Sequence, residues 1–218
     1  MREAFHDQLD AIFEDLAGIA NAVEDAVRRA TDALLTSDAA MAEQVISDDA
    51  IIDRASERVE ENAFALLSLQ QPVAGDLRTL ISALRMVSEL ERMGDLSVHV
   101  AKIARLRLPK IAVPEEVRPL ILGMADVAQE MVHRVSGVIA GRDVAAALAM
   151  HRVDDQMDYL RRSSFSQLLA SDWAHGVEAA VDIALLGRYY ERIADHAVSI
   201  ADRVVFIVTG ENPVPAGL

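Results

Sequence analysis

The chain carries one motif twice, 100 positions apart. Residues 90–104 read LERMGDLSVHVAKIA, and residues 190–204 read YERIADHAVSIADRV. Each stretch has a Glu–Arg pair near its start and an Asp four positions after the Glu. Apolar residues in both recur every three or four positions, which is the period of an α-helix with one buried face. The sequence therefore predicts a duplicated helical unit.

The duplication extends beyond this motif. Asp38 and Asp143, both suitable helix N-caps, lie 105 positions apart. The acid pairs 49/53 and 154/158 are also 105 positions apart, so the two halves slip by five positions in the turn before the repeated motif. Such an internal repeat determines the architecture, and short loops favour antiparallel neighbours. We predict an all-α tandem repeat of two antiparallel three-helix bundles.

Turn and cap residues place six long helices. We expect them at about 2–36, 38–69, 75–106, 115–140, 143–170 and 176–209, with breaks at Gln71-Pro72, at two prolines in 108–114 and at Gly141. The predicted units are a first bundle over 1–108, a linker over 109–114, a second bundle over 115–210 and a tail over 211–218. The buried face of the first helix is predicted to comprise Leu9, Ile12, Phe13, Leu16, Ile19, Ala20, Val23 and Val27.

Composition narrows the class of protein. The 218 residues are 52% hydrophobic but only 4% aromatic, with 10 Gly and 6 Pro, which favours long helices over strands and turns. The formal net charge of −14 disfavours nucleic acid and anionic lipid as partners. Cysteine is absent, so thiolate metal sites are excluded. The chain shows no signal peptide and no membrane-spanning stretch, and we expect a cytoplasmic protein.

Acidic residues interrupt the apolar stripe of the third and sixth helices. In the third helix the stripe Leu77, Leu80, Ile81, Leu84 and Val87 continues through Glu91 and Asp95 to Val98. In the sixth, Val177, Val181 and Ala184 lead in the same way to Glu191, Asp195 and Val198. Carboxylates at core-like positions, repeated in both halves, suggest a site rather than a solvated face.

The acids form i, i+4 pairs on four helices. Carboxylates four residues apart share a helix face and repel one another when nothing lies between them. Pairs brought together from neighbouring helices form an all-oxygen site suited to iron or manganese. The predicted metal ligands are Asp49, Asp53, Glu91 and Asp95 in the first half and Asp154, Asp158, Glu191 and Asp195 in the second. The alternatives are solvated acids, or salt bridges to Arg92 and Arg192.

These residues resemble the motifs of the PhoU family, which is associated with the phosphate-specific transport system. The chain has QQPVAGDLR at 70–78, followed by the two Glu-Arg motifs, and the resemblance covers about residues 5–210. It implies tandem three-helix bundles whose E/D-x-x-x-D motifs, at the eight acids named above, bind iron, manganese, zinc or magnesium. Leu96 departs from the family pattern, which often has His there, whereas His196 keeps it.

The resemblance also implies a function and partners. Family members restrain the Pst phosphate importer and keep the PhoR sensor kinase quiet when phosphate is plentiful. The expected contacts are the PstB ATPase subunit and PhoR, with a homodimer, and the inner membrane is reached only through these partners. We expect a regulator of phosphate homeostasis and no enzyme, since no nucleophile–base constellation or P-loop is present.

Two other interpretations remain open. Glu-x-x-His occurs at Glu3/His6 and at Glu130/His133, a spacing found in ferritin-like metal enzymes, but the two occurrences do not occupy equivalent repeat positions. A metal-free helical scaffold would instead have its acids solvated or bridged by arginine. His196, next to Asp195, is a further possible ligand or a surface residue.

Overall fold

The computed structural model describes residues 2–211 as six α-helices joined by short turns. These are α1 (Arg2–Thr36), α2 (Ala39–Gln70), α3 (Ala74–Arg107), α4 (Arg118–Gly141), α5 (Val144–Leu168) and α6 (Gly176–Thr209). No strand occurs among these residues, so the predicted all-α class is confirmed. The predicted tail over 211–218 lies, apart from Glu211, outside the described residues.

The helix ends follow the predicted local chemistry. The side chain of Asp38 accepts a hydrogen bond of 3.0 Å from the Met41 amide, and Asp143 accepts one of the same length from the Ala146 amide. Each satisfies an amide that the first helical turn leaves without a partner. Gly210 ends α6 in the left-handed conformation that glycine adopts without strain. The N-caps Asp38 and Asp143 therefore occupy equivalent positions in the two halves.

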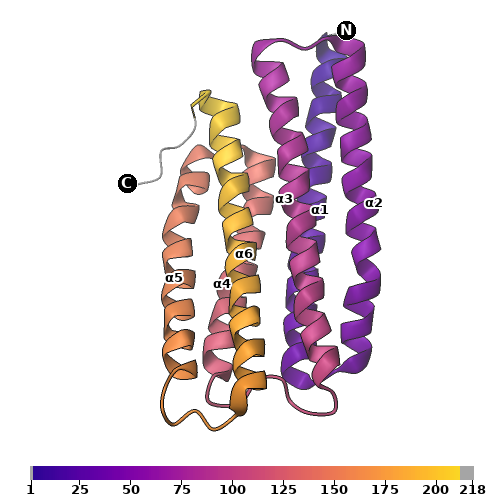
Figure 1. Ribbon diagram of the computed structural model, residues 1–218. Coiled ribbons are helices and arrows are strands. Elements are labelled where there is room, and N and C mark those ends of the chain that lie inside the picture. Colours follow the sequence, from indigo (N-terminus) through magenta and orange to yellow (C-terminus); the bar gives the residue numbers. More distant parts are fainter. Residues whose placement is uncertain (1, 212–218) are drawn as a thin grey trace.

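The helices run alternately up and down and form two three-helix bundles side by side (Figure 1). In each bundle all three helices pack against one another, and the bundles meet through α1 against α4 and α3 against α6. Helices α2 and α5 lie on opposite outer sides (Figure 1). The first bundle extends beyond the second at its N-terminal end, because α1 is 35 residues long and α4 is 24.

One hydrophobic core runs through both bundles. Every helix contributes buried residues, and the predicted buried face of α1 is confirmed at all of its positions. Across the bundle interface the Tyr190 hydroxyl lies 2.8 Å from the hydroxyl of Thr31. Arg107, at the end of α3, donates to the buried carboxylate of Asp182 on α6 at 2.9 Å. The boundaries of the two predicted units stay a prediction, since the core is continuous.

The predicted apolar stripe of α3 and α6 is partly wrong. Leu77 and Ile81 are exposed on α3, as are Val177 and Val181 on α6. Leu80 and Val87 are buried as expected. Each of these helices contacts neighbours on several sides, so its buried face is wide and is displaced from the stripe that we inferred.

The connection between the bundles is longer than predicted. Residues 108–117 lie outside the helices, compared with the expected linker of 109–114. Ala112, Val113 and Val117 of this segment are nevertheless buried in the core. None of the helices in the described part of the chain is long and apolar enough to cross a membrane.

Candidate functional site: two acidic clusters

The eight predicted ligands lie in two equivalent places, one in each bundle. The first acid cluster, Asp49 and Asp53 on α2 with Glu91 and Asp95 on α3, lies where these two helices pack together. The second acid cluster, Asp154 and Asp158 on α5 with Glu191 and Asp195 on α6, lies between the corresponding helices of the other bundle. The duplication of the sequence thus produces one acidic seam between α2 and α3 and a second between α5 and α6.

The four carboxylates of the first acid cluster influence one another. Partial burial raises the pKa of Asp49 to about 6, and repulsion from Asp53, Asp95 and Glu91 adds to this, while Lys102 opposes it. Burial is also the main cause of the raised pKa of Glu91, followed by repulsion from Asp53. A cation between these groups would relieve the repulsion, so the donor set suits a hard metal ion.

The side chains do not form a ready-made metal site as they stand. Over residues 2–211 no group of three or more His, Asp or Glu side chains is placed so that it could hold a metal ion. Arg92 contacts Asp95 at 2.9 Å in an exposed ion pair, as one of the alternative interpretations expected. Carboxylate side chains would have to turn toward a bound ion, and the predicted ligands stay a prediction.

Gly94 permits the close approach of α2 to α3 at this cluster. A Cβ on Gly94 would lie 3.2 Å from Ile52 Cδ1 and 3.3 Å from Asp49 Oδ1, which is tighter than ordinary packing. The equivalent position in the second half is Ala194. The glycine therefore leaves space beside the Asp49 carboxylate that the second bundle fills with a methyl group.

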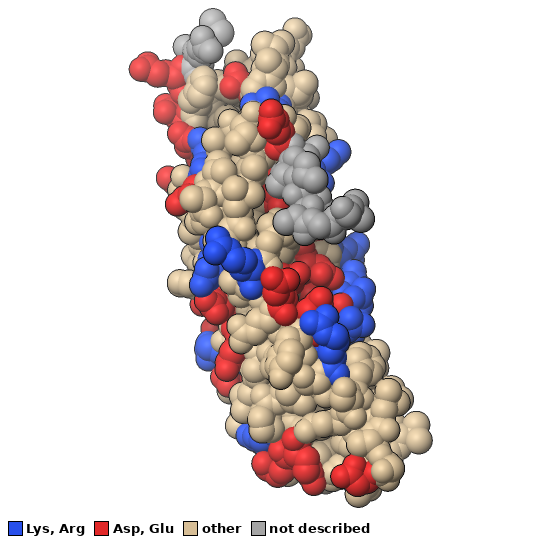
Figure 2. Space-filling model, turned by 90° about the vertical axis from the view of Figure 1, so that its left-hand side faces the viewer, with Lys and Arg blue, Asp and Glu red and all other residues tan. Residues whose placement is uncertain are grey.

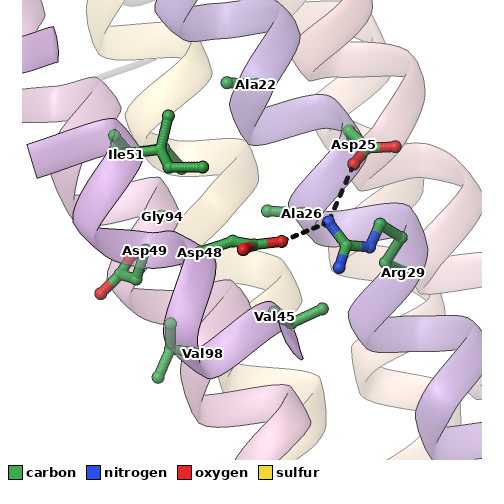
Figure 3. A pocket seen from close by; sticks show the side chains of 11 residues that line it. Ala22, Asp25, Ala26, Arg29, Val45, Asp48, Asp49, Ile51, Gly94 and Val98 are labelled. Carbon is green, nitrogen blue, oxygen red and sulfur yellow. Dashed lines mark hydrogen bonds and ion pairs between the residues drawn. The ribbon is translucent and has the colours of Figure 1, made fainter. Parts of the chain in front are cut away.

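A cavity of about 100 Å³ adjoins Gly94 between α1, α2 and α3 (Figure 3). In it Arg29 Nη1 contacts Asp48 at 2.9 Å and Asp25 at 3.4 Å. Figure 3 shows the Asp48 side chain turned toward Arg29 and the Asp49 side chain turned away from it. Arg29 thus neutralises Asp48 and leaves Asp49 to the acid cluster.

The second acid cluster has a similar electrostatic environment around Asp154. Burial raises the pKa of Asp154 to about 6, and the carboxylates of Asp195, Asp158 and Asp155 contribute. The pKa of Asp195 is raised for the same reason, burial first and then Glu191. The structure therefore brings these acids near one another, and their role as metal ligands stays a prediction.

Glu191 differs from its counterpart Glu91. It is buried, and its Oε1 lies 2.8 Å from Arg161 of α5 while its Oε2 lies 2.6 Å from Arg188 of α6. From the sequence, Arg192 is the expected neutralising residue, and neither Arg161 nor Arg188 is foreseen. Arg188 precedes Glu191 by three positions and was in principle detectable as an i, i+3 pair, but only the packing of α5 on α6 brings Arg161 to it.

The histidines near the acids have other partners. His196 Nδ1 lies 2.5 Å from Glu89 Oε2, so its contact is with the other bundle. His133 contacts Glu24, while Glu130 contacts Arg134. The second Glu-x-x-His therefore has its two members engaged separately, as expected of a chance occurrence.

Comparison with known proteins identifies the family. A PhoU domain model matches residues 16–104 and 121–204. The chain belongs to the PhoU family. Among curated PhoU relatives, "Phosphate-specific transport system accessory protein PhoU homolog 2" of Mycobacterium bovis is 49% identical over 98% of this chain and 100% of its own length. "Homolog 1" of Mycobacterium leprae is 48% identical over 98% of this chain and 96% of its own.

Solved PhoU structures have the same fold. The phosphate transport system regulatory protein PhoU from Streptococcus pneumoniae has a TM-score of 0.87 at 26% identity, with 96% of this chain and 99% of that chain covered. PhoU from Pseudomonas aeruginosa has a TM-score of 0.88 at 28% identity, with 95% and 100% covered. These relatives are named accessory and regulatory proteins. The prediction of a regulator rather than an enzyme is confirmed, and the ferritin-like alternative is wrong.

Proposed function

We propose that this protein is a cytoplasmic negative regulator of phosphate uptake through a Pst-type importer and of the phosphate-starvation two-component response. The observation that carries the proposal is the likeness, over 98% of the chain, to relatives named as accessory proteins of the phosphate-specific transport system. The protein acts by binding other proteins, and its partners are the PstB ATPase subunit and the PhoR sensor kinase.

An exposed apolar surface supports a docking role. At the turn between α5 and α6, Leu169 is 84% and Val177 79% exposed, and Val181 and Phe165 are exposed beside them. A groove of about 470 Å³ runs between these side chains. Toward the lower end of Figure 2, where this part of the molecule lies, a broad uncharged area is bordered below by acidic patches. Exposed apolar surfaces of this kind are characteristic of protein interaction sites.

Metal binding is the second part of the proposal. Divalent or trivalent ions (iron, manganese, zinc or magnesium) would neutralise the carboxylates that repel one another and would hold α2 against α3. The support is the pKa of Asp49, which is raised to about 6 by burial and by three neighbouring acids. A cation would supply the positive charge that this cluster lacks.

A metal-free scaffold is the competing candidate, and one observation favours it. Arg161 and Arg188 bridge Glu191, as that hypothesis expects.

A homodimer also belongs to the proposal. Light scattering on the purified protein measures its mass in solution, and a mass close to the 23.7 kDa of one chain would remove the dimer.

The experiment that tests the regulatory role uses a deletion strain grown with abundant phosphate. An alkaline phosphatase reporter of the phosphate-starvation response is expected to be high in the deletion strain and low again when the wild-type gene is restored. Low reporter activity in the deletion strain would contradict the proposed function.

The same strain tests the metal. The double variant Glu91→Gln, Asp95→Asn is expected to fail to restore low activity, whereas Glu57→Gln, an exposed acid on α2 outside the clusters, should restore it. Both variants must be present at wild-type levels by immunoblot. If the double variant complements fully, metal at the first acid cluster is not required for signalling.

A further inference from the structure

The buried carboxylate of Glu191 is already neutralised by the protein itself. Arg161 takes one of its oxygens and Arg188 the other, at 2.8 and 2.6 Å. Glu191 is only 8% exposed, so its carboxylate is shielded from solvent in both charge-assisted contacts, although the Arg188 side chain itself is half exposed. A metal ion that used Glu191 would have to displace a guanidinium and would then lie beside its positive charge.

The first half has serine at both equivalent positions. By the repeat, Arg161 corresponds to Ser56 and Arg188 to Ser88. Ser56 is 1% exposed, and its hydroxyl has no hydrogen-bond partner in the structure. Because position 161 faces Glu191, the repeat places Ser56 toward Glu91. The orphaned hydroxyl therefore marks the place where the second half holds an arginine.

The arginine that does lie in the first acid cluster is of a different kind. Arg92 contacts Asp95, and both side chains are well exposed, so the pair is weak and screened by solvent. Glu91 faces the like charges of Asp53 and Asp95, with Arg92 as the opposing cation. The first acid cluster thus keeps a deficit of positive charge next to a buried polar gap.

We propose that the two clusters are functionally unequal: the first binds the metal ion, and in the second Arg161 and Arg188 take the place of the metal and clasp α5 to α6. The inference rests on the metal binding proposed above for the first cluster. In the second, Asp158 is paired with Arg162 at 3.5 Å and Glu191 with two arginines, which leaves Asp154 and Asp195 as the remaining acids. One half therefore responds to metal and the other is held independently of it.

The test is calorimetric titration of the full-length protein with Mn²⁺, which counts the ions bound. Asp49→Asn with Glu91→Gln should abolish tight binding, whereas Asp154→Asn with Glu191→Gln should leave the wild-type binding in place. Arg161→Ser with Arg188→Ser should add a second class of site. Ser88 is exposed and lies three residues before Glu91. Ser88→Arg should weaken Mn²⁺ binding at the first acid cluster by about tenfold, with Ser88→Ala as its control. Equal losses from the two acid double variants would overturn the inequality.

Thermal unfolding in EDTA tests the clasp without reference to metal. Arg161→Ser with Arg188→Ser leaves the buried Glu191 unpaired and should lower Tm by roughly 5 °C or more. Adding Glu191→Gln to this variant removes the stranded charge, so it should recover most of the loss and gain no Mn²⁺ site. An unchanged Tm in the arginine double variant would overturn the clasp. Absence of Mn²⁺ binding in the wild type and in the arginine double variant would instead refute both the proposed metal binding and the inequality.

Discussion

Replacing Asp49 by Asn removes the carboxylate with the most perturbed titration in the first acid cluster. Its pKa in the folded protein is about 6, against an ordinary value of 3.8. Because the folded value lies above the unfolded one, the charged carboxylate opposes folding above about pH 6, and this cost disappears as the pH falls toward 4. Wild-type protein free of metal should therefore gain stability as the pH is lowered from 7 to 5.

The magnitude follows from the same shift. A difference of about two pKa units corresponds to about 3 kcal/mol for a fully buried group. Asp49 is only partly buried, so solvent screening reduces the expected gain of the Asn variant to about 1 kcal/mol at pH 8. For a chain of this size, that is roughly 2–4 °C in Tm. At pH 4 the variant and the wild type should have the same Tm.

The assay is thermal unfolding at pH 8 and pH 4, in EDTA and in excess Mn²⁺. In EDTA at pH 8 Asp49→Asn should be the more stable protein, whereas Mn²⁺ should reverse the order, because only the wild type gains a ligand-bound state. Glu57→Gln on the same helix is the matched control, and its Tm should equal that of the wild type both in EDTA and in Mn²⁺. An Asn variant that is less stable in EDTA at pH 8 would refute the idea that like charges crowd this carboxylate.

Three further changes test the fold and the approach of α2 to α3. Gly94→Ala should lower stability by about 1–2 kcal/mol in thermal unfolding and weaken Mn²⁺ binding, since the new methyl group meets Ile52 and Asp49; an affinity equal to wild type would contradict the packing argument. Asp38→Ala removes the N-cap of α2 and should lower the free energy of unfolding in urea by about 1 kcal/mol. A loss below about 0.3 kcal/mol would argue against the cap. Tyr190→Phe should cost about 1 kcal/mol, because Thr31 keeps its bond to the Val27 carbonyl; a loss of about 3 kcal/mol would mean that repacking dominates.

Local signals accounted for most of the helix boundaries. The caps Asp38 and Asp143, the Gln71-Pro72 break and the Gly141 stop act within a few residues of the chain, so the sequence alone placed the helix ends to within a few residues. The register of the repeat likewise placed all four acid pairs on the helix seams where they are found. These features depend on spacing along a helix, which the order of residues determines.

Contacts between helices were harder to infer. The apolar stripe led us to expect Leu77 and Ile81 in the core, but their exposure depends on which neighbours pack around α3. The pairing of His196 with Glu89 likewise joins residues of opposite bundles. Helical periodicity identifies an apolar face without identifying the helix that covers it.

The sequence by itself determined that this chain is a duplicated set of long helices with acids at repeated positions, because those properties follow from period, caps and spacing. Only the tertiary structure showed that the repeats are chemically different. Arg161 reaches Glu191 across the α5–α6 seam, and Ser56 occupies the same place in the first half. Side chains distant in the chain interact according to how the helices pack, and that packing decides which buried charge already has a partner.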